Sequence, residues 1–332
     1  MGNIDIKQYE GLNSGETMTR LLAELGKIND DLVVLGADVL GLAKEFSAQY
    51  PNRVYNFGIA EQNMIAAAAG FAKFGKIPVT ELMGFLVARV AEQIRDEVCY
   101  NNQNVKIYTH GCGLNMAPGG VSHHADVDIS ILRSFPNMTI VQPASPKAII
   151  FLGTKAILEF KGPVYFRLST GLGVVEGSGC TDNGEIYEND NLEFEIGKAI
   201  TLQEGNDVTL IASGLPVQLA FKATKSLLKE GISARLIDMH TIKPIDQEII
   251  LKAARETNGI VTIEDGSTAG GLGAAVCSLV CNDYPTRVKQ IGFPNDKFTV
   301  IGSSEEELWN YYGLNVDNVV KEVKNIMITP KN

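Results

Sequence analysis

Residues 55–70 read YNFGIAEQNMIAAAAG, a turn followed by a helix made almost wholly of small and apolar side chains. Asn56 and Gly58 favour the turn, and Glu61 falls in the first turn of the predicted helix. A helix without a polar face is expected to be buried at an interface. A carboxylate there either caps its own helix or meets a nitrogen base on a ligand, because burial without a partner is costly. The segment alone leaves both interpretations open.

The step from a short strand into a helix recurs along the chain. Apolar strand-like runs alternate with helical periodicity, which is typical of parallel sheets covered by helices on both faces. The first part also contains a stretch of helical periodicity at residues 85–100. Strands are predicted at residues 31–38, 53–57, 76–80, 105–110, 139–143 and 164–168, and again at 207–212, 234–238 and 259–264. The sequence therefore predicts an α/β fold in which each of two domains has a mainly parallel sheet.

A polar stretch separates these two units. Residues 181–191 read TDNGEIYENDN and follow a glycine-rich segment, which is typical of a domain boundary. A chain of 332 residues is long enough for two hydrophobic cores. We expect a first domain at residues 1–180, a linker at 181–192 and a second domain at 193–332.

Charge and composition exclude several classes of protein. The net charge of −10 argues against binding to nucleic acid or to anionic membranes. No apolar run is long enough to cross a bilayer, and the N-terminus lacks the pattern of an export signal. The five cysteines are odd in number and scattered, as expected for reduced thiols in a cytoplasmic protein.

Several segments together resemble one family. They are FGIAEQN (57–63), ARVAEQIRDEVCY (88–100), GGVSHHAD (119–126), LRSFPNM (132–138), LIDMHTIKPID (236–246) and EDGSTAGGLG (264–273). In this order, over roughly residues 12–325, they resemble the C-terminal half of a transketolase. The resemblance implies a pyrimidine-binding domain followed by a transketolase C-terminal domain.

One segment of a transketolase has no counterpart in this sequence. The family holds the diphosphate and its metal ion through a Gly-Asp-Gly segment followed by an Asn, and Gly-Asp-Gly does not occur in this sequence. The chain thus resembles the C-terminal subunit of a split transketolase. This implies thiamine diphosphate shared with an N-terminal diphosphate-binding subunit, Mg²⁺ or Ca²⁺ held by that partner, and a heterotetramer of two plus two chains. No metal ligand is expected on this chain.

The resemblance assigns the cofactor's pyrimidine to two side chains. Glu61 matches the catalytic glutamate, which bonds the ring nitrogen N1′ and favours the imino tautomer that removes the cofactor's C2 proton. Phe85 matches an aromatic residue that stacks on the pyrimidine, although a core phenylalanine would fit the same pattern.

Three further residues are assigned near the substrate or the cofactor. His123 matches the histidine of a Gly-Pro-Thr-His-Gln segment that bonds ketose hydroxyls, and it lies in a glycine-rich loop after a strand, where α/β sheets bind ligands. His124 replaces the glutamine of that pattern, so the resemblance does not identify which sugar is the substrate. Asp38 matches a position near the sugar hydroxyls. His110 either faces the cofactor or caps its strand.

Arg167 is predicted to hold the substrate's anionic end. It matches an arginine that binds a terminal phosphate, and its guanidinium would suit a sugar phosphate or a sulfonated sugar equally. A surface salt bridge is the structural alternative.

The predicted activity is transfer of a two-carbon ketol unit from a ketose to an aldose. One alternative is a 1-deoxyxylulose-5-phosphate synthase-like half or the β-type subunit of a 2-oxoacid dehydrogenase, both of which use the same glutamate. Another is a non-catalytic partner subunit. A last alternative is nucleotide binding at the Gly270 loop, although that loop lacks the third glycine of the dinucleotide pattern and fits a tight turn into a helix.

Overall fold

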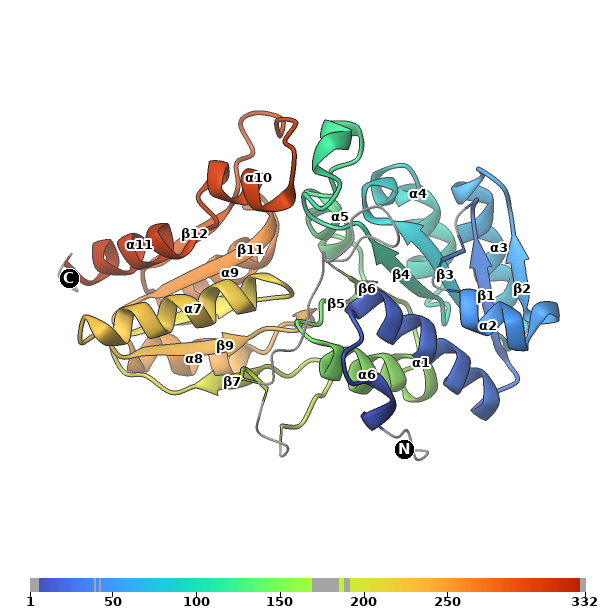
Figure 1. Ribbon diagram of the computed structural model, residues 1–332, viewed down its shortest axis with the longest axis horizontal. Coiled ribbons are helices and arrows are strands. Elements are labelled where there is room, and N and C mark those ends of the chain that lie inside the picture. Colours follow the sequence, from blue (N-terminus) through green and yellow to red (C-terminus); the bar gives the residue numbers. More distant parts are fainter. Residues whose placement is uncertain (1–5, 39, 42, 169–184, 188–191, 329–332) are drawn as a thin grey trace.

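The computed structural model describes residues 6–38, 40–41, 43–168, 185–187 and 192–328. Two sheets covered by helices lie side by side in an elongated molecule, one in each half of the chain (Figure 1). This confirms the predicted α/β fold with two mainly parallel sheets. The predicted linker falls mostly outside the described residues, and the exact domain boundaries stay a prediction.

The first sheet has seven strands in the order β10-β5-β6-β4-β3-β1-β2. All neighbours are parallel except β10 and β5. β1, β4 and β6 are buried along their whole length, as expected for a sheet covered on both faces. The strands are β1 (Leu32–Gly36), β2 (Val54–Asn56), β3 (Ile77–Met83), β4 (Lys106–His110), β5 (Thr139–Val141), β6 (Val164–Arg167) and β10 (Thr241–Lys243).

Each face of the first sheet is covered by its own apolar cluster. α1 (Ser14–Ile28) and α6 (Pro146–Thr154) pack on one face, and α3 (Glu61–Lys73) and α5 (Asp128–Arg133) pack on the other. The remaining helical segments are η1 (Ile6–Tyr9), α2 (Lys44–Gln49), η2 (Pro51–Arg53), η3 (Gly84–Ala88), α4 (Ala91–Gln93), η4 (Ile94–Tyr100), η5 (Ala117–Ser122) and η6 (Lys155–Glu159).

The second sheet has five strands in the order β12-β11-β8-β9-β7, and only β7 runs antiparallel to its neighbour. Its strands are β7 (Ile200–Gln203), β8 (Val208–Ala212), β9 (Ala234–Asp238), β11 (Ile260–Ser267) and β12 (Val288–Phe293). Its helices are α7 (Pro216–Lys229), α8 (Gln247–Glu256), α9 (Leu272–Asp283), α10 (Glu305–Tyr312) and α11 (Val316–Ile328).

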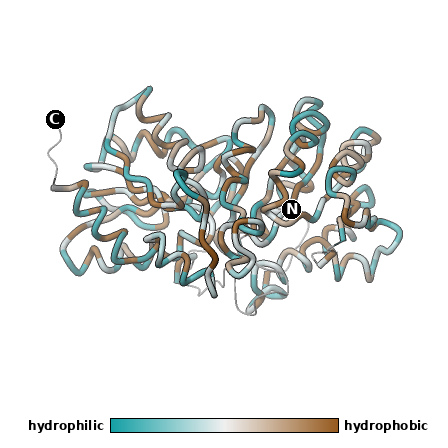
Figure 2. The backbone as a smooth tube through the Cα atoms, turned by 90° about the horizontal axis from the view of Figure 1, so that it is seen from above, coloured by the Kyte–Doolittle hydropathy of each residue, from teal (hydrophilic) through white to brown (hydrophobic). Residues whose placement is uncertain are grey.

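The two halves are connected by more than the chain itself. β10 follows β9 of the second sheet but pairs with β5 of the first. The apolar cluster around α1 and α6 also continues into side chains of α7 and α11. In Figure 2, where the chain is coloured by residue hydropathy, hydrophobic stretches occur in both halves of the molecule. The second domain therefore completes the first sheet instead of only lying beside it.

The nine predicted strands are all present, with ends shifted by a few residues. The sequence missed β7, β10 and β12. β7 and β12 are edge strands that are only partly buried, so they show no continuous apolar run. The predicted helix at residues 85–100 is irregular: a 3₁₀ turn, one short α-helical turn and a π-helical segment follow one another. Among the described residues, no helix has the length and apolar character needed to span a bilayer.

Candidate functional site

A pocket of about 230 Å³ opens where several parallel strands of the first sheet end. Ligands of open α/β sheets bind at this position, beyond the carboxyl ends of the strands. β1, β3 and β4 and the start of α3 supply its walls. The lining residues are Ala37, Asp38, Ile59, Glu61, Glu81, Leu82, Met83, Phe85, Leu86, Arg89 and His110.

Glu61 is the first residue of α3, and a turn places it there. Gly58 adopts a positive φ of 64°, and the side-chain oxygen of Asn56 accepts hydrogen bonds from the N–H groups of Gly58 (2.8 Å) and Asp38 (3.3 Å). Glu61 is 6% exposed, and its carboxylate makes no hydrogen bond or ion pair with another described residue. A buried carboxylate without a partner is costly, so this geometry favours a ligand partner over a capping role.

Phe85 and His123 contact each other, although they come from different loops. Their ring centroids are 4.7 Å apart, and Phe85 lines the pocket. The Nδ1 atom of half-buried His123 lies 2.9 Å from the hydroxyl of Ser122. A Cβ atom at Gly119 would lie 2.6 Å from the Cβ of His123, so only glycine allows this ring position. The structure therefore brings His123 to the pocket through Phe85.

His110 and Asp38 both line the pocket, which brings four of the predicted site residues together. Asp38 is exposed and follows β1, whereas His110 is 2% exposed and ends β4. The Nε2 atom of His110 lies 3.5 Å from Oε1 of Glu81, which is also buried. The roles of these residues stay predictions.

Two charged lining residues, Glu81 and Arg89, were not predicted as site residues from the sequence. Glu81 lies in an otherwise apolar strand, and a carboxylate in such a run is the signal that could have identified it. Arg89 follows the pocket's 3₁₀ turn. Arg89 is the arginine among the lining residues, and its guanidinium makes no ion pair with another described residue.

The structure places Arg167 at the end of buried strand β6, away from the pocket. Its side chain has no exposed surface and does not line the pocket. Nε donates to Oδ2 of Asp128 at 2.7 Å, and Nη1 donates to Oδ1 of Asp265 at 2.6 Å. Nη2 donates to the carbonyl oxygens of Ala125 (3.0 Å) and Asp265 (3.1 Å). Arg167 is thus a buried link between the domains and not a surface salt bridge, and its predicted substrate role stays a prediction.

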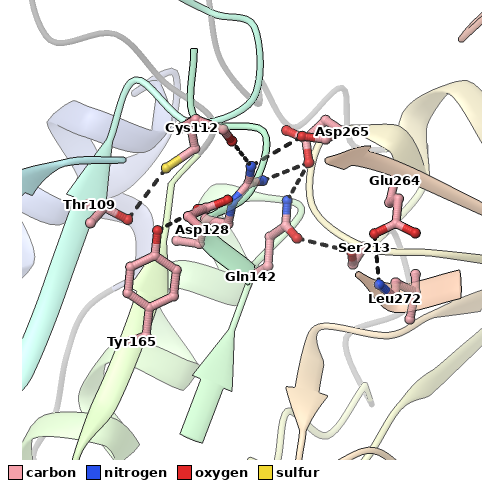
Figure 3. Close-up of polar contacts among 11 residues, drawn as sticks. Thr109, Cys112, Asp128, Gln142, Tyr165, Ser213, Glu264, Asp265 and Leu272 are labelled. Atoms are coloured by element: carbon pink, nitrogen blue, oxygen red, sulfur yellow. Dashed lines mark hydrogen bonds and ion pairs between the residues drawn. The ribbon is translucent and has the colours of Figure 1, made fainter. Parts of the chain in front are cut away.

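A polar network surrounds this arginine at the domain boundary. Figure 3 shows Asp128, Gln142 and Asp265 converging there from both halves of the chain. The amide of Gln142 donates to Asp265 at 2.8 Å, and its oxygen accepts from Ser213 at 3.0 Å. Because buried charges are stable only when paired, this network fixes the relative position of the two domains.

The second domain shows no free anion site at the Gly270 loop. Glu264 accepts hydrogen bonds from the N–H groups of Leu272 (2.7 Å) and Gly273 (2.8 Å), so the N-terminus of α9 already holds a carboxylate (Figure 3). A Cβ atom at Gly271 would lie 1.8 Å from Oε2 of Glu264, which leaves no room for a phosphate. Burial raises the pKa of Glu264 to about 7. This geometry argues against nucleotide binding at this loop.

His124 ties the His123 loop to the second domain. Its Nδ1 lies 2.7 Å from the hydroxyl of Thr299, its Nε2 lies 3.3 Å from the carbonyl oxygen of Ala117, and burial lowers its pKa. Within the described ranges, no group of three or more His, Cys, Asp or Glu side chains is arranged to hold a metal ion.

Two family models match most of this chain. The transketolase pyrimidine binding domain matches residues 10–174, and the transketolase C-terminal domain matches residues 197–319. A "putative transketolase C-terminal section" of Methanocaldococcus jannaschii is 40% identical over 323 residues, 95% of this chain and 96% of that protein. The chain belongs to the transketolase family.

Other members of the transketolase family are also similar over nearly their whole length. An apulose-4-phosphate transketolase subunit of Phocaeicola vulgatus is 37% identical and covers 92% of this chain and 95% of its own length. A 6-deoxy-6-sulfo-D-fructose transketolase subunit of a Clostridium sp. is 35% identical, with 92% of each chain covered. A solved structure described as a split gene transketolase, inactive β4 tetramer, has a TM-score of 0.85 at 37% identity and covers 97% of this chain and 100% of that one.

The synthase alternative is matched less well. The 1-deoxy-D-xylulose-5-phosphate synthase 1 of Geobacter sulfurreducens is 34% identical, and this chain covers only 43% of it. The higher coverage of the transketolase subunits therefore favours the prediction of a transketolase subunit over that of a synthase.

Transketolases use thiamine diphosphate, and the pocket fits its aminopyrimidine ring. Glu61 offers a buried carboxylate without a partner, and Phe85 offers an aromatic ring in the same wall. A flat ring with nitrogen atoms at its edge satisfies both, because it accepts stacking on its face and hydrogen bonds at its rim.

Proposed function

We propose that this chain is the subunit that supplies the aminopyrimidine site of a two-subunit transketolase. The complex transfers a two-carbon ketol unit from a ketose to an aldose. The observation that carries the proposal is the buried carboxylate of Glu61, which has no partner among the residues that the structure describes and lines a pocket beside Phe85.

When bound, thiamine diphosphate would supply a nucleophilic carbon for cleavage of the ketose. Glu61 would hold the pyrimidine nitrogen N1′ and favour the tautomer that can take up a proton. Phe85 stacks on the ring, and the apolar side chains of Leu82 and Met83 exclude water. His123 lies against Phe85 and binds hydroxyl groups of the sugar, and Asp38 and His110 face the same space.

The diphosphate and its Mg²⁺ or Ca²⁺ are held by a partner subunit in this proposal. The described residues contain no cluster able to hold a metal ion. α3 buries one face in the first domain, while Ile59 is 77% exposed before it and Phe74 is 88% exposed after it. Large apolar side chains exposed beside a site are typical of a subunit interface. The assembly is a heterotetramer of two plus two chains.

The substrate carries an anionic group, a phosphate or a sulfonate. Two relatives are named for apulose 4-phosphate and for 6-deoxy-6-sulfo-D-fructose, which both bear such a group. Arg89 is the guanidinium in the pocket wall and is free to bind an oxyanion by paired hydrogen bonds. Arg89 therefore takes the role that the sequence had assigned to Arg167.

Reconstitution tests the proposal. The chain is mixed with an N-terminal diphosphate-binding transketolase subunit, with thiamine diphosphate and Mg²⁺. The pair should cleave ketoses and transfer the ketol unit, whereas either chain alone should be inactive. Pyruvate decarboxylation without ketol transfer would favour the synthase or dehydrogenase alternative. Full activity of a pair that carries Glu61→Ala would favour a non-catalytic subunit.

A further inference from the structure

Glu81 and His110 form a buried pair in the wall of the pocket. Oε1 of Glu81 lies 3.5 Å from Nε2 of His110, and their side chains are 1% and 3% exposed. In the parallel pairing of β3 with β4, Glu81 lies opposite Tyr108. His110 is two residues further on, so both side chains point to the same face of the sheet.

The two ring nitrogens of His110 have different surroundings. Nε2 is shut off from solvent and makes no hydrogen bond with the described residues, and a carboxylate oxygen of Glu81 lies 3.5 Å from it. Nδ1 also makes no hydrogen bond with the described residues, but it is not among the solvent-inaccessible atoms, and the ring lines the pocket. Nδ1 is thus the nitrogen left for a ligand.

We propose that Glu81 is a positioning residue for His110. The carboxylate holds the imidazole proton on Nε2, so that Nδ1 stays a hydrogen-bond acceptor for a hydroxyl group of the substrate. This inference rests on the proposed function, because a substrate with several hydroxyl groups follows from ketol transfer.

Electrostatics favours this tautomer. A proton on Nδ1 would point the lone pair of Nε2 at a carboxylate oxygen in buried surroundings, where such a contact is unfavourable. The second ring nitrogen of a histidine is commonly fixed in this way by a carboxylate. Arg89 can only donate hydrogen bonds, so an acceptor at His110 completes the set that a polyol needs.

The tautomer can be read directly by NMR. The sequence contains only 4 histidines, so a chain labelled with ¹⁵N-histidine gives a spectrum that is simple to assign, and His110→Gln identifies the His110 signals. Long-range ¹H–¹⁵N correlations should show the proton of His110 on Nε2. In Glu81→Gln the Nε2–H form should lose its predominance, while the signals of His123, His124 and His240 stay in place as internal controls.

Kinetics of the reconstituted pair give the second readout. Glu81→Gln should raise KM for the ketose roughly three- to tenfold with a smaller change in kcat, as expected when one substrate hydrogen bond is weakened. Glu24→Gln, an exposed residue paired with Lys27, is the matched control and should change neither value.

A proton on Nδ1 in the wild-type chain, which a protonated Glu81 donating to Nε2 would produce, overturns the proposal. So does a tautomer that does not respond to Glu81→Gln. The wild-type spectrum needs no variant to fold and no active partner. A failure of ketol transfer would therefore contradict the proposed function, whereas the position of the His110 proton would still be measured independently.

Discussion

Arg167 at the end of β6 and Asp265 in β11 form an ion pair of 2.6 Å across the two domains, and neither side chain has any exposed surface. The same guanidinium holds the carbonyl oxygen of Ala125, and the N–H of Ser267 donates to the carbonyl oxygen of Asp126 at 2.7 Å. The loop that carries His123 is therefore fastened to the second domain within three residues after that histidine.

Replacing Arg167 by methionine should destabilise the chain strongly. The carboxylates of Asp128 and Asp265 would lose the positive charge of the guanidinium while staying buried, and breaking a buried ion pair costs about 3–5 kcal/mol. Urea unfolding followed by circular dichroism measures the loss. Arg95→Met, which removes an exposed pair with Asp96, should change the free energy of unfolding little, because exposed ion pairs contribute little to stability. Equal midpoints for the two variants would contradict the assignment of Arg167 to the domain link.

Arg89→Ala should discriminate between charged and neutral substrates. A charge-assisted hydrogen bond to a phosphate or sulfonate contributes enough that its loss should raise KM for the anionic ketose about tenfold or more. An uncharged ketose of the same length serves as the control substrate, and its KM should change little. Steady-state assays of the reconstituted pair measure both values, and an equal effect on the two sugars would remove Arg89 from this role.

Asp238 should make the stability of the chain depend on pH. Its side chain has no exposed surface, and burial raises its pKa to about 7 although Tyr187 donates a hydrogen bond of 2.8 Å to it. In the unfolded chain an aspartate ionises near pH ~4. Between about pH 4 and 7 the unfolded state therefore binds fewer protons than the folded state, and stability falls as pH rises, by up to about 1.4 kcal/mol per pH unit.

Asp238→Asn keeps the shape and removes the titration. Over that pH range, urea midpoints of the variant should fall less steeply than those of the wild-type chain. Parallel pH profiles of the two proteins would show that Asp238 does not titrate as its burial implies.

The sequence predicted the fold because its strongest signals are local. Central strands such as β1 and β8 are buried on both faces and read as continuous apolar runs. Edge strands such as β12 expose part of each face and carry no such signal. β10 was missed for a different reason: its three residues belong to one half of the chain and pair with the other.

The site was predicted where each residue follows its strand closely. Glu61, Phe85, His110 and Asp38 all lie at or just beyond strand ends, so the topology alone gathers them. Arg167 also ends a strand, but the partners that bury it come from α5 and β11, which no local pattern reveals. Glu81 and Arg89 were missed because their position depends on how β3 and the 3₁₀ turn after it face the pocket.

The central claim is that Glu61 activates thiamine diphosphate through its pyrimidine ring. The most direct test is the rate at which the C2 proton of the bound cofactor exchanges with deuterium in the reconstituted complex, followed by NMR after acid quench. Glu61→Gln should slow this exchange about 100-fold or more, as expected for the loss of general acid–base catalysis, while the cofactor still binds. Exchange at the wild-type rate in that variant, with the cofactor bound, would contradict the account.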